Sequence, residues 1–419
     1  MVDFALTPDQ LQLQQVAREF ARKEIRPLAA EYDRKTNADE TFPWEIYEKG
    51  NELGFNKALI PEALGGSGLG DLDFAIIMEE LAWGDVGVAL TYLAHWLTLR
   101  PLINGGTDEQ RSRFLAPLVA DADRRQLAAI CATEHGTAGD LSPRDHFQQA
   151  GDHRTGIDPT DFVTNYTVPA AERREVTTTA RPDGDHFLIN GTKRFITNGP
   201  AASVYLVMVS MDASKPDSET MGAFMVAADA PGISIGTIED KMGHRLSKMS
   251  EVIFEDVRVP LSDALSPLAL AHGLASSTTN VGALCVGLAR AAYEEALAYS
   301  KTRYKGGNKI IFHQVVGAKL TEMAIGIKTG RLLTYQAAWE NDQGRGLGAI
   351  QPMAKVYCSE MALEVTLAAQ QILGGYGYLR DMPTEKWVRD ACVGPIYDFT
   401  NDMLKANHIL PVLAFSPDV

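Results

Sequence analysis

The stretch Met382-Pro-Thr-Glu-Lys-Trp-Val-Arg-Asp390, followed by Ile396-Tyr-Asp-Phe-Thr400, carries the most specific pattern in this chain. It places a carboxylate, Asp398, next to a threonine and shortly after an Arg-Asp pair. The glycine-rich run Gln371-Ile-Leu-Gly-Gly-Tyr-Gly-Tyr378 comes before it. A helical pattern follows Asp398, and aspartate is a favoured helix N-cap, so capping is one interpretation of this residue.

Composition bounds the class of protein. A chain of 419 residues with 45% hydrophobic content is long enough for two or three domains with a substantial core. We expect no membrane span, because the apolar runs are shorter than the ~18 residues that cross a bilayer. The net charge of −15 disfavours nucleic acid and anionic membranes as partners. The acidic N-terminal segment is not typical of a signal peptide, and the scattered cysteines include no CxxC pair. We therefore predict a cytoplasmic protein with reduced thiols.

The hydrophobic period changes twice along the chain, which predicts three domains. Residues 1–127 have helical spacing, and Thr7 with Gln10 forms a capping-box start. Residues 128–262 are dominated by short β-branched or aromatic runs separated by turns, typical of a β-barrel-like domain. Residues 263–419 return to the helical pattern and suggest a bundle of four long helices. The predicted fold class is multidomain α+β.

The strands of the middle domain are predicted from these short runs, with turns at Arg181-Pro-Asp-Gly-Asp185 and at Asn190-Gly191. The predicted strands are Ala128–Thr133, Glu175–Ala180, Phe187–Ile189, Arg194–Ile196, Val204–Val209, Ala223–Ala227 and Val252–Val257.

The order helical, β, helical, together with several motifs in the same order, resembles the acyl-CoA dehydrogenase family. The segment around Asp398 resembles the C-terminal signature of that family, which usually contains Tyr-Glu-Gly-Thr. In the family this glutamate removes the α-proton of an acyl-CoA thioester, so the resemblance implies that Asp398 is the catalytic base. Phe399 stands where the family usually has glycine. The resemblance therefore implies a base of shorter reach beside a bulkier residue.

The resemblance also implies an FAD cofactor. Cys131-Ala-Thr-Glu-His-Gly-Thr-Ala-Gly-Asp140 resembles the family segment Thr-Glu-Pro-Gly-x-Gly-Ser-Asp. Ala132 and Thr133 are accordingly expected to contact the flavin ring, and Gly139 replaces a serine that contacts phosphate. Small residues allow backbone N–H groups to approach a planar ring or a phosphate closely.

A second flavin segment is expected at Phe195-Ile-Thr-Asn-Gly199, which resembles the family's Trp-Ile-Thr-Asn-Gly. There Phe195 would cover the flavin and Thr197 would reach its N5 atom, while Thr400 would touch the flavin from the C-terminal signature. Replacing tryptophan by phenylalanine keeps the stacking surface and loses the indole donor.

The resemblance further implies that FAD is shared between subunits. Arg303-Tyr-Lys-Gly-Gly-Asn-Lys-Ile-Ile-Phe-His-Gln314 stands where relatives clamp the FAD of a neighbouring subunit, with Arg303 on the pyrophosphate and Gln314 on the adenosine side. Gln371, Gly374 and Gly375 would complete the adenine end. A homodimer is therefore expected, commonly a homotetramer of two such dimers.

Some relatives carry their catalytic glutamate early in the C-terminal bundle, and the matching residue here is Ser277. This leaves Asp398 as the base. The next position, usually an arginine that holds the acyl-CoA, is Thr278.

Further residues are expected around the acyl group. Phe399 and Ser277 would line its pocket, as would Tyr92, His95 and Trp96, whose helix closes the far end of the pocket in relatives. The alternative for His95 is a core histidine with satisfied hydrogen bonds.

The segment from about 141 to 172 is extra relative to the family pattern. Its Asp145-His146 and Asp152-His153 pairs lack the spacing of a metal site, so we expect no metal. It is interpreted as a surface loop near the mouth of the site or as a decoration without function.

Two functions remain open from the sequence. The first is FAD-dependent α,β-dehydrogenation of an acyl-CoA, with an electron-transfer flavoprotein as electron acceptor. The shorter reach of Asp398 and the apolar Phe399 favour a cyclic, aryl-substituted or branched acyl group. The alternative is a nitroalkane-oxidase-like flavoprotein of the same fold, because those enzymes also use an aspartate base.

Overall fold

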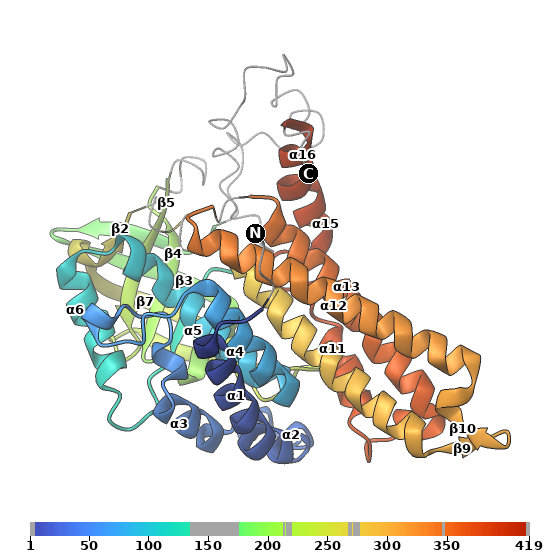
Figure 1. Ribbon diagram of the computed structural model, residues 1–419. Helices are drawn as coiled ribbons and strands as arrows, with labels where there is room; N and C mark the ends of the chain where they lie inside the picture. Colours follow the sequence, from blue (N-terminus) through green and yellow to red (C-terminus); the bar gives the residue numbers. More distant parts are fainter. Residues whose placement is uncertain are drawn as a thin grey trace.

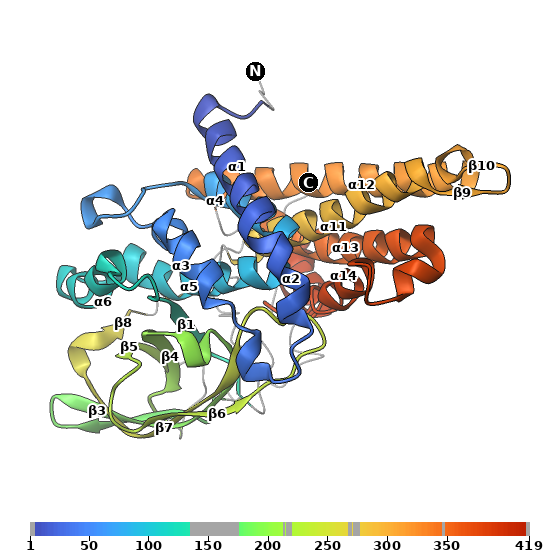
Figure 2. The ribbon, with the colours of Figure 1, turned by 90° about the horizontal axis from the view of Figure 1, so that it is seen from below.

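The computed structural model describes residues 5–134, 176–212, 214, 220–266, 270, 277–345 and 348–415. They form an N-terminal group of helices, a β-sheet and a C-terminal group of long helices, in the predicted order (Figure 1). Two N-terminal helices, α4 (Asp71–Gly84) and α5 (Val86–Gly105), lie between the other two parts (Figure 2). Helix α5 packs on strand β1 (Ala128–Cys131), and α4 packs on helix α11 (Ser277–Thr302).

The other N-terminal helices surround this central pair. They are α1 (Pro8–Phe20), α2 (Arg26–Asp33), α3 (Trp44–Glu52) and α6 (Asp108–Ala120). The capping box predicted for the first helix is confirmed. The Thr7 N–H donates to Gln10 Oε1 at 3.0 Å, and the Gln10 N–H donates to Thr7 Oγ1 at 3.2 Å.

Helix α5 is apolar around its whole circumference because it lies in the core. By length and composition alone it could cross a membrane, yet 83% of its most apolar window is buried inside the protein. Asp85 caps its N-terminus by accepting hydrogen bonds from the N–H groups of Gly87 and Val88. A helix that is hydrophobic all round is typical of the core of a large protein.

The middle domain is an eight-stranded sheet with the strand order β6-β7-β3-β2-β4-β5-β8, in which β1 also pairs with β4. The pairs β1–β4 and β2–β4 are parallel, and the remaining pairs are antiparallel. The strands after β1 are β2 (Thr179–Asp183), β3 (His186–Thr197), β4 (Val204–Ser210), β5 (Met221–Ala227), β6 (Ile233–Ile238), β7 (Met249–Pro260) and β8 (Ala264–Leu265).

The turn predicted at Asn190-Gly191 is wrong, because β3 runs through it as one strand. The two halves of β3 both pair with the equally long β7, and the register shifts between Ile189 and Gly191. Gly191 has φ 149°, and the Asn190 side chain donates to Asp256 Oδ1 at 3.0 Å. The Asn-Gly pair therefore forms a bulge, which lets a strand bend without ending. Strand β6 was also not predicted.

The described residues of the C-terminal part form three long helices, α11, α12 (Gln314–Asp342) and α13 (Ile350–Leu373), rather than the four expected. The fourth, α14 (Thr384–Ala391), has only 8 residues. Gly374 has φ 63° and ends α13, and Pro383 lies just before α14. The short elements here are β9 (Tyr304–Lys305), β10 (Asn308–Lys309), α15 (Asn401–Leu404) and α16 (Leu410–Phe415).

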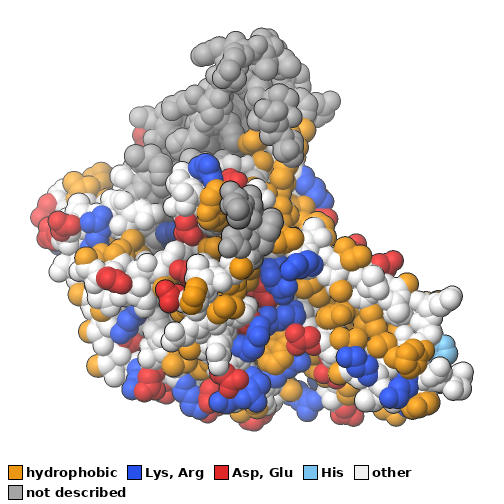
Figure 3. Space-filling view, in the orientation of Figure 1, with side chains coloured by type: hydrophobic (Ala, Val, Ile, Leu, Met, Phe, Trp, Pro, Cys, Tyr) orange, Lys and Arg blue, Asp and Glu red, His pale blue; other side chains and the backbone are white. Residues whose placement is uncertain are grey.

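Helix α12 leaves an apolar face uncovered. Val315 is 71% exposed and Ile325 60%, and Leu332 and Trp339 are also exposed. Figure 3 shows hydrophobic side chains gathered over the long helices on this side of the molecule. Exposed apolar side chains that gather on one side of a protein usually mark an interaction surface.

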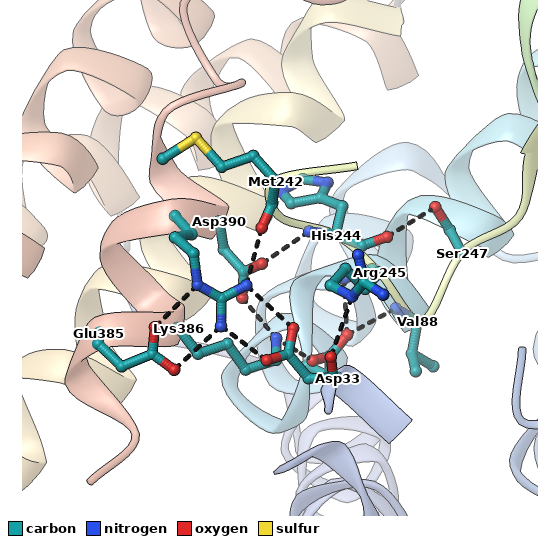
Figure 4. Close-up of polar contacts among 12 residues, drawn as sticks. Asp33, Val88, Met242, His244, Arg245, Ser247, Glu385, Lys386 and Asp390 are labelled. Carbon is teal, nitrogen blue, oxygen red and sulfur yellow. Dashed lines mark hydrogen bonds and ion pairs between the residues drawn. The ribbon is translucent and has the colours of Figure 1, made fainter. Parts of the chain in front are cut away.

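A buried ammonium joins all three parts of the molecule (Figure 4). Lys386 on α14 donates to Asp85 Oδ2 and to Asp390 Oδ2, each at 2.5 Å. The other oxygen of Asp390 accepts the backbone N–H of His244, in the loop before β7, at 2.7 Å. Burial lowers the pKa of Lys386, but the Asp390 and Asp85 carboxylates more than offset this and raise it. The lysine therefore stays charged and ties α14, the N-terminus of α5 and the sheet together.

A second ionic group lies beside it. Arg389 donates to both oxygens of Asp33, at 3.1 and 2.6 Å, and to the Met242 carbonyl at 2.7 Å. It also forms an i, i+4 ion pair with Glu385 at 2.8 Å. These contacts link α14 to α2 and to the same loop of the sheet domain.

We predict that Lys386→Met destabilises the protein by about 3–5 kcal/mol, because it leaves two buried carboxylates without their partner. The measurement is the midpoint of thermal or urea unfolding. The matched control is Lys405→Met, which breaks the exposed Lys405–Glu360 pair at 2.5 Å, with side chains 49% and 48% exposed. That variant should lose at most about 1 kcal/mol. Equal losses in the two variants would contradict the proposed importance of the buried group.

Candidate active site

The turn that carries Asp398 has a left-handed backbone at two successive positions. Asp398 has φ 48° and Phe399 has φ 67°. Side chains in this region cost roughly 1–2 kcal/mol per residue. Helix α15 begins directly after the turn, and its N-cap is Thr400, whose Oγ1 accepts the Met403 N–H at 3.3 Å. The capping interpretation of Asp398 is therefore wrong.

The carboxylate of Asp398 is enclosed although the residue as a whole is only partly buried. Oδ1 accepts a hydrogen bond from Ser277 Oγ at 3.0 Å. Oδ2 is buried and finds no hydrogen-bond partner among the described residues. Burial raises the pKa of Asp398 to about 6, against the opposing effects of Ser277 and Lys355. A buried carboxylate with one free oxygen and a pKa near neutrality has the properties of a general base.

Ser277 stands at the start of α11 as described and is itself buried. The two candidate positions for a base, at residues 277 and 398, are thus adjacent in space although 121 residues separate them in sequence. Ser277, which is expected to line the acyl pocket, thus also holds Asp398. Thr278 follows it with a buried Oγ1 that has no partner among the described residues.

A residue that sequence analysis did not single out, Lys355, lies under the same turn. It is fully buried on α13, and its ammonium donates to the Phe399 carbonyl at 2.7 Å and to Asn401 Oδ1 at 2.8 Å. The available signal was a lysine at a position where helical spacing predicts a buried side chain.

The end of β3 brings the two predicted flavin segments together. A second register shift lies between Lys193 and Ile196, and Phe195 within it has φ 58°. Bulges re-aim side chains, and the Phe195 ring is 49% exposed. The N–H of Arg194 donates to the Thr133 carbonyl at 2.8 Å, which places Ala132 and Thr133 beside this ring. Thr197 follows on the same strand, half-buried.

Glu134 and Lys193 were not predicted as site residues, yet they hold this loop. Lys193 donates to Glu134 Oε1 at 2.6 Å and to the Ala132 carbonyl at 3.1 Å. Glu134 also accepts the N–H groups of Thr177 and Thr178, at 2.6 and 3.0 Å. Burial raises the pKa of Glu134, but Lys193 outweighs this and brings it to about 2. The predicted contact at Gly139 and the 141–172 insert lie outside the described residues.

The residues expected to bind the adenosine end of FAD lie at the opposite end of α13 from Lys355. Arg303 is exposed, with its guanidinium 5.6 Å from the centre of the Tyr376 ring. Gln371, Gly374 and Gly375 lie near Tyr376 in the chain, and Gln314 begins α12; all four are exposed. Helix α13 has 24 residues and is therefore about 36 Å long. Within one chain, the residues expected at the adenosine end of FAD therefore lie far from Lys355 and the Asp398 turn.

Tyr92, His95 and Trp96 are core residues in this structure. His95 Nε2 contacts the Asn56 carbonyl at 2.9 Å, and its Nδ1 accepts the Ala128 N–H at 3.0 Å. Burial lowers the pKa of His95 to about 4, so the ring is neutral. The Tyr92 hydroxyl donates to Asn51 Oδ1, and the Trp96 indole N–H donates to the Phe55 carbonyl. This agrees with the alternative of a satisfied core histidine, and we leave the three residues out of the proposed pocket.

Comparison with known proteins decides the family. Three family models match in order: acyl-CoA dehydrogenase N-terminal domain at residues 7–122, middle domain at 163–257 and C-terminal domain at 269–409. The chain belongs to the acyl-CoA dehydrogenase family. The short-chain specific acyl-CoA dehydrogenase of Bos taurus mitochondria is 32% identical over 408 residues, 95% of this chain and 89% of the relative.

Solved structures agree with this acyl-CoA dehydrogenase assignment. Butyryl-CoA dehydrogenase from Megasphaera elsdenii superposes with a TM-score of 0.85 at 31% identity, covering 99% of this chain and 100% of that one. The FAD complex of PigA superposes with a TM-score of 0.82 at 26% identity, covering 99% and 100%. The protein is accordingly an FAD-dependent oxidoreductase that acts on an acyl-CoA. Phe195, which is half-exposed and next to a residue bonded to Thr133, fits a planar flavin.

The Asp398–Phe399 turn generates a test of its backbone strain. At an ordinary helix position glycine is less stable than alanine by about 1 kcal/mol. At Phe399, with φ 67°, we expect the reverse order: Phe399→Gly should be about 1 kcal/mol more stable than Phe399→Ala. Both variants remove the ring, so their difference in unfolding free energy isolates the backbone.

The control for this pair is Ala30→Gly on the exposed face of α2, which should destabilise the protein. If Phe399→Ala is as stable as Phe399→Gly while Ala30→Gly behaves normally, the turn is not strained.

Proposed function

We propose that this acyl-CoA dehydrogenase uses Asp398 to remove the α-proton of its acyl-CoA substrate. The observation that carries the proposal is the enclosed carboxylate: Ser277 holds Oδ1 at 3.0 Å while buried Oδ2 has no partner among the described residues. An oxygen left unbonded in a buried place is costly unless something else occupies it. The α-C–H of the acyl-CoA, placed against Oδ2, would occupy this position and give its proton to that oxygen.

The reaction removes two hydrogens and forms a C=C bond between the α- and β-carbons. The α-proton goes to Asp398 Oδ2, and the electron pair of that C–H bond becomes the second bond of the alkene. When bound, FAD accepts the β-hydrogen as hydride and so takes up both electrons. The backbone N–H of Asp398 is the proposed donor to the thioester carbonyl, because stabilising the developing negative charge there lowers the barrier.

We further propose that the acyl group is cyclic, aryl-substituted or branched. Aspartate is one methylene shorter than glutamate, and misplacements of about 1 Å strongly affect proton transfer. An acyl group with bulk near its α-carbon can approach a retracted base. Phe399, whose ring centre is 5.6 Å from that of His408, follows Asp398 directly, and we propose that it supplies an apolar lining for such a group. The named relatives are a short-chain and a butyryl-CoA enzyme, so a short straight chain is the main competing substrate.

The assembly is proposed to be a homodimer or homotetramer that shares FAD across subunits. Arg303, Gln314, Gln371, Gly374 and Gly375 are exposed at the end of α13 remote from Lys355, where a neighbouring chain could present its cofactor. The uncovered apolar face of α12 supplies a surface for such contacts. Electrons are proposed to pass to an electron-transfer flavoprotein, in a cytoplasmic setting consistent with four free cysteines.

The central prediction concerns Asp398→Asn, which keeps the shape of the side chain but cannot accept the proton. Flavin reduction under anaerobic single-turnover conditions should fall by about 10²–10⁴-fold, the usual contribution of a positioned base. FAD content should stay near that of the unmodified chain, and the melting temperature should not fall, because Thr400 and not Asp398 caps α15. Reduction at an unchanged rate would show that Asp398 is not the base.

The same residue sets a pH dependence. A base must be ionised, so flavin reduction should rise with pH through about 6 in the unmodified protein. The free energy of unfolding depends on pH in the opposite direction, because folding raises the pKa of Asp398. The stability that protonated Asp398 contributes is complete below the ordinary pKa of aspartate and is lost as pH rises through about 6. Both effects should disappear in Asp398→Asn.

A substrate panel tests the acyl group. We expect ring-bearing or branched acyl-CoA thioesters to give kcat/KM values at least about 10-fold above butyryl- and octanoyl-CoA, an effect of about 1.4 kcal/mol on the transition state. Asp398→Glu should shift this preference toward straight chains, since it restores the longer reach. Efficient turnover of butyryl-CoA with poor turnover of every ring-bearing thioester would contradict the proposal. Reduction by nitroalkanes alone would favour the alternative function.

A further inference from the structure

Lys355 is buried in a way that stability alone does not explain. Its side chain is fully buried on α13. Its two hydrogen bonds go to the carbonyl of Phe399, the second residue of the left-handed turn, and to Oδ1 of Asn401, which follows that turn closely. Among the described residues it forms no salt bridge. A buried ammonium without a carboxylate partner is costly, and an apolar residue of the same volume is often more stable.

Lys355 contacts the strained turn of Asp398 and Phe399. Asp398 and Phe399 are consecutive residues in the left-handed region, and such strain persists only where surrounding structure determines the conformation. On one side Ser277 holds the carboxylate at 3.0 Å, and on the other Lys355 holds the peptide carbonyl of Phe399 at 2.7 Å. These two contacts come from α11 and α13, so they anchor the turn to two separate long helices.

We propose that Lys355 is the positioning residue of the Asp398 base: through the Phe399 carbonyl it holds the left-handed turn that presents the carboxylate to the substrate. The proposal rests on the assignment of Asp398 as base. Lys355 does not touch the reacting atoms, and it acts on the geometry and the charge of the group that does.

The positive charge of Lys355 also supports the role of Asp398 as a base. The ammonium favours the ionised form of Asp398 and opposes the rise in its pKa that burial causes. The titratable groups that face Lys355 are Asp398, the Cys285 thiol on α11 and Glu360 on α13. Burial lowers the pKa of Lys355 to about 8, although all three of these neighbours oppose that change. The lysine is thus charged at neutral pH and loses its proton as pH rises through about 8.

Two variants test the proposal in the FAD-loaded protein, with Lys405→Met on the exposed Glu360 pair as matched control. Lys355→Met keeps the length of the side chain and removes its charge and donors. We expect its flavin reduction to fall by about 10²-fold, the effect of a displacement of about 1 Å at a reacting group, with little change in KM. The rise of flavin reduction with pH in Lys355→Met should also shift to above pH 6, because the ammonium no longer favours ionised Asp398.

Lys355→Arg retains the cation at every working pH. The unmodified protein should lose activity as pH rises through about 8, and this variant should not. Because this comparison uses the unmodified chain and a conservative variant, it decides the question even if Lys355→Met does not fold.

Asp398 can also be followed without turnover. The difference in melting temperature between each chain and its Asp398→Asn counterpart, measured across pH, reports where that carboxyl titrates. In the Lys355→Met background this profile should lie at higher pH than in the unmodified chain.

The outcomes separate the two proposals. If Asp398→Asn abolishes flavin reduction while Lys355→Met matches Lys405→Met in rate and in pH profile, the role of Lys355 is overturned and the base assignment stands. If Asp398→Asn reduces its flavin normally, the base assignment fails, and the role of Lys355 fails with it. Loss of rate in Lys355→Met with an unmoved pH profile and an unmoved melting-temperature profile would indicate a purely structural lysine and would also overturn the proposal.

Discussion

The buried ammonium of Lys386 is the contact on which the relative placement of the three domains depends. It lies between Asp85, which caps the helix at the centre of the N-terminal domain, and Asp390, which also holds the loop leading into β7. Each carboxylate would be costly to bury alone, and the lysine would be costly without them. Lys386 and Asp390 share helix α14, whereas Asp85 lies 301 residues away in the chain, so the ammonium reaches its second carboxylate only when the domains are docked, which makes the docking specific.

The same network reaches the segment that carries Asp398. The loop held by Asp390 carries His244, whose ring contacts that of Tyr397 at 5.7 Å, and Tyr397 precedes Asp398. Lys355 approaches from the other side and holds the Phe399 carbonyl. Lys386 therefore reaches Tyr397 only through Asp390 and the His244 loop, whereas Lys355 contacts the Phe399 carbonyl directly. The first secures the domains, and the second secures the turn.

Glycine is the usual family residue at position 399, and the backbone explains why. The turn requires a left-handed φ, which glycine adopts freely and phenylalanine adopts at a cost. Phenylalanine at this position places an aromatic ring beside Asp398, the proposed base. The strain at this position is in keeping with the clustering of strained residues at functional sites.

The sequence by itself determined the order of the domains, because this order follows from local periodicity and from motifs that are contiguous in the chain. The assignments of the flavin segments and of Asp398 rest on such motifs and stay predictions. The sequence misjudged Asn190-Gly191, since only pairing with the long β7 turns that signal into a bulge. It could not determine that Tyr92 and His95 are core residues or that Ser277, Lys355 and Asp398 meet. Those outcomes depend on burial and on contacts between distant helices, and a residue's partners across such distances are decided only when the tertiary structure encloses it.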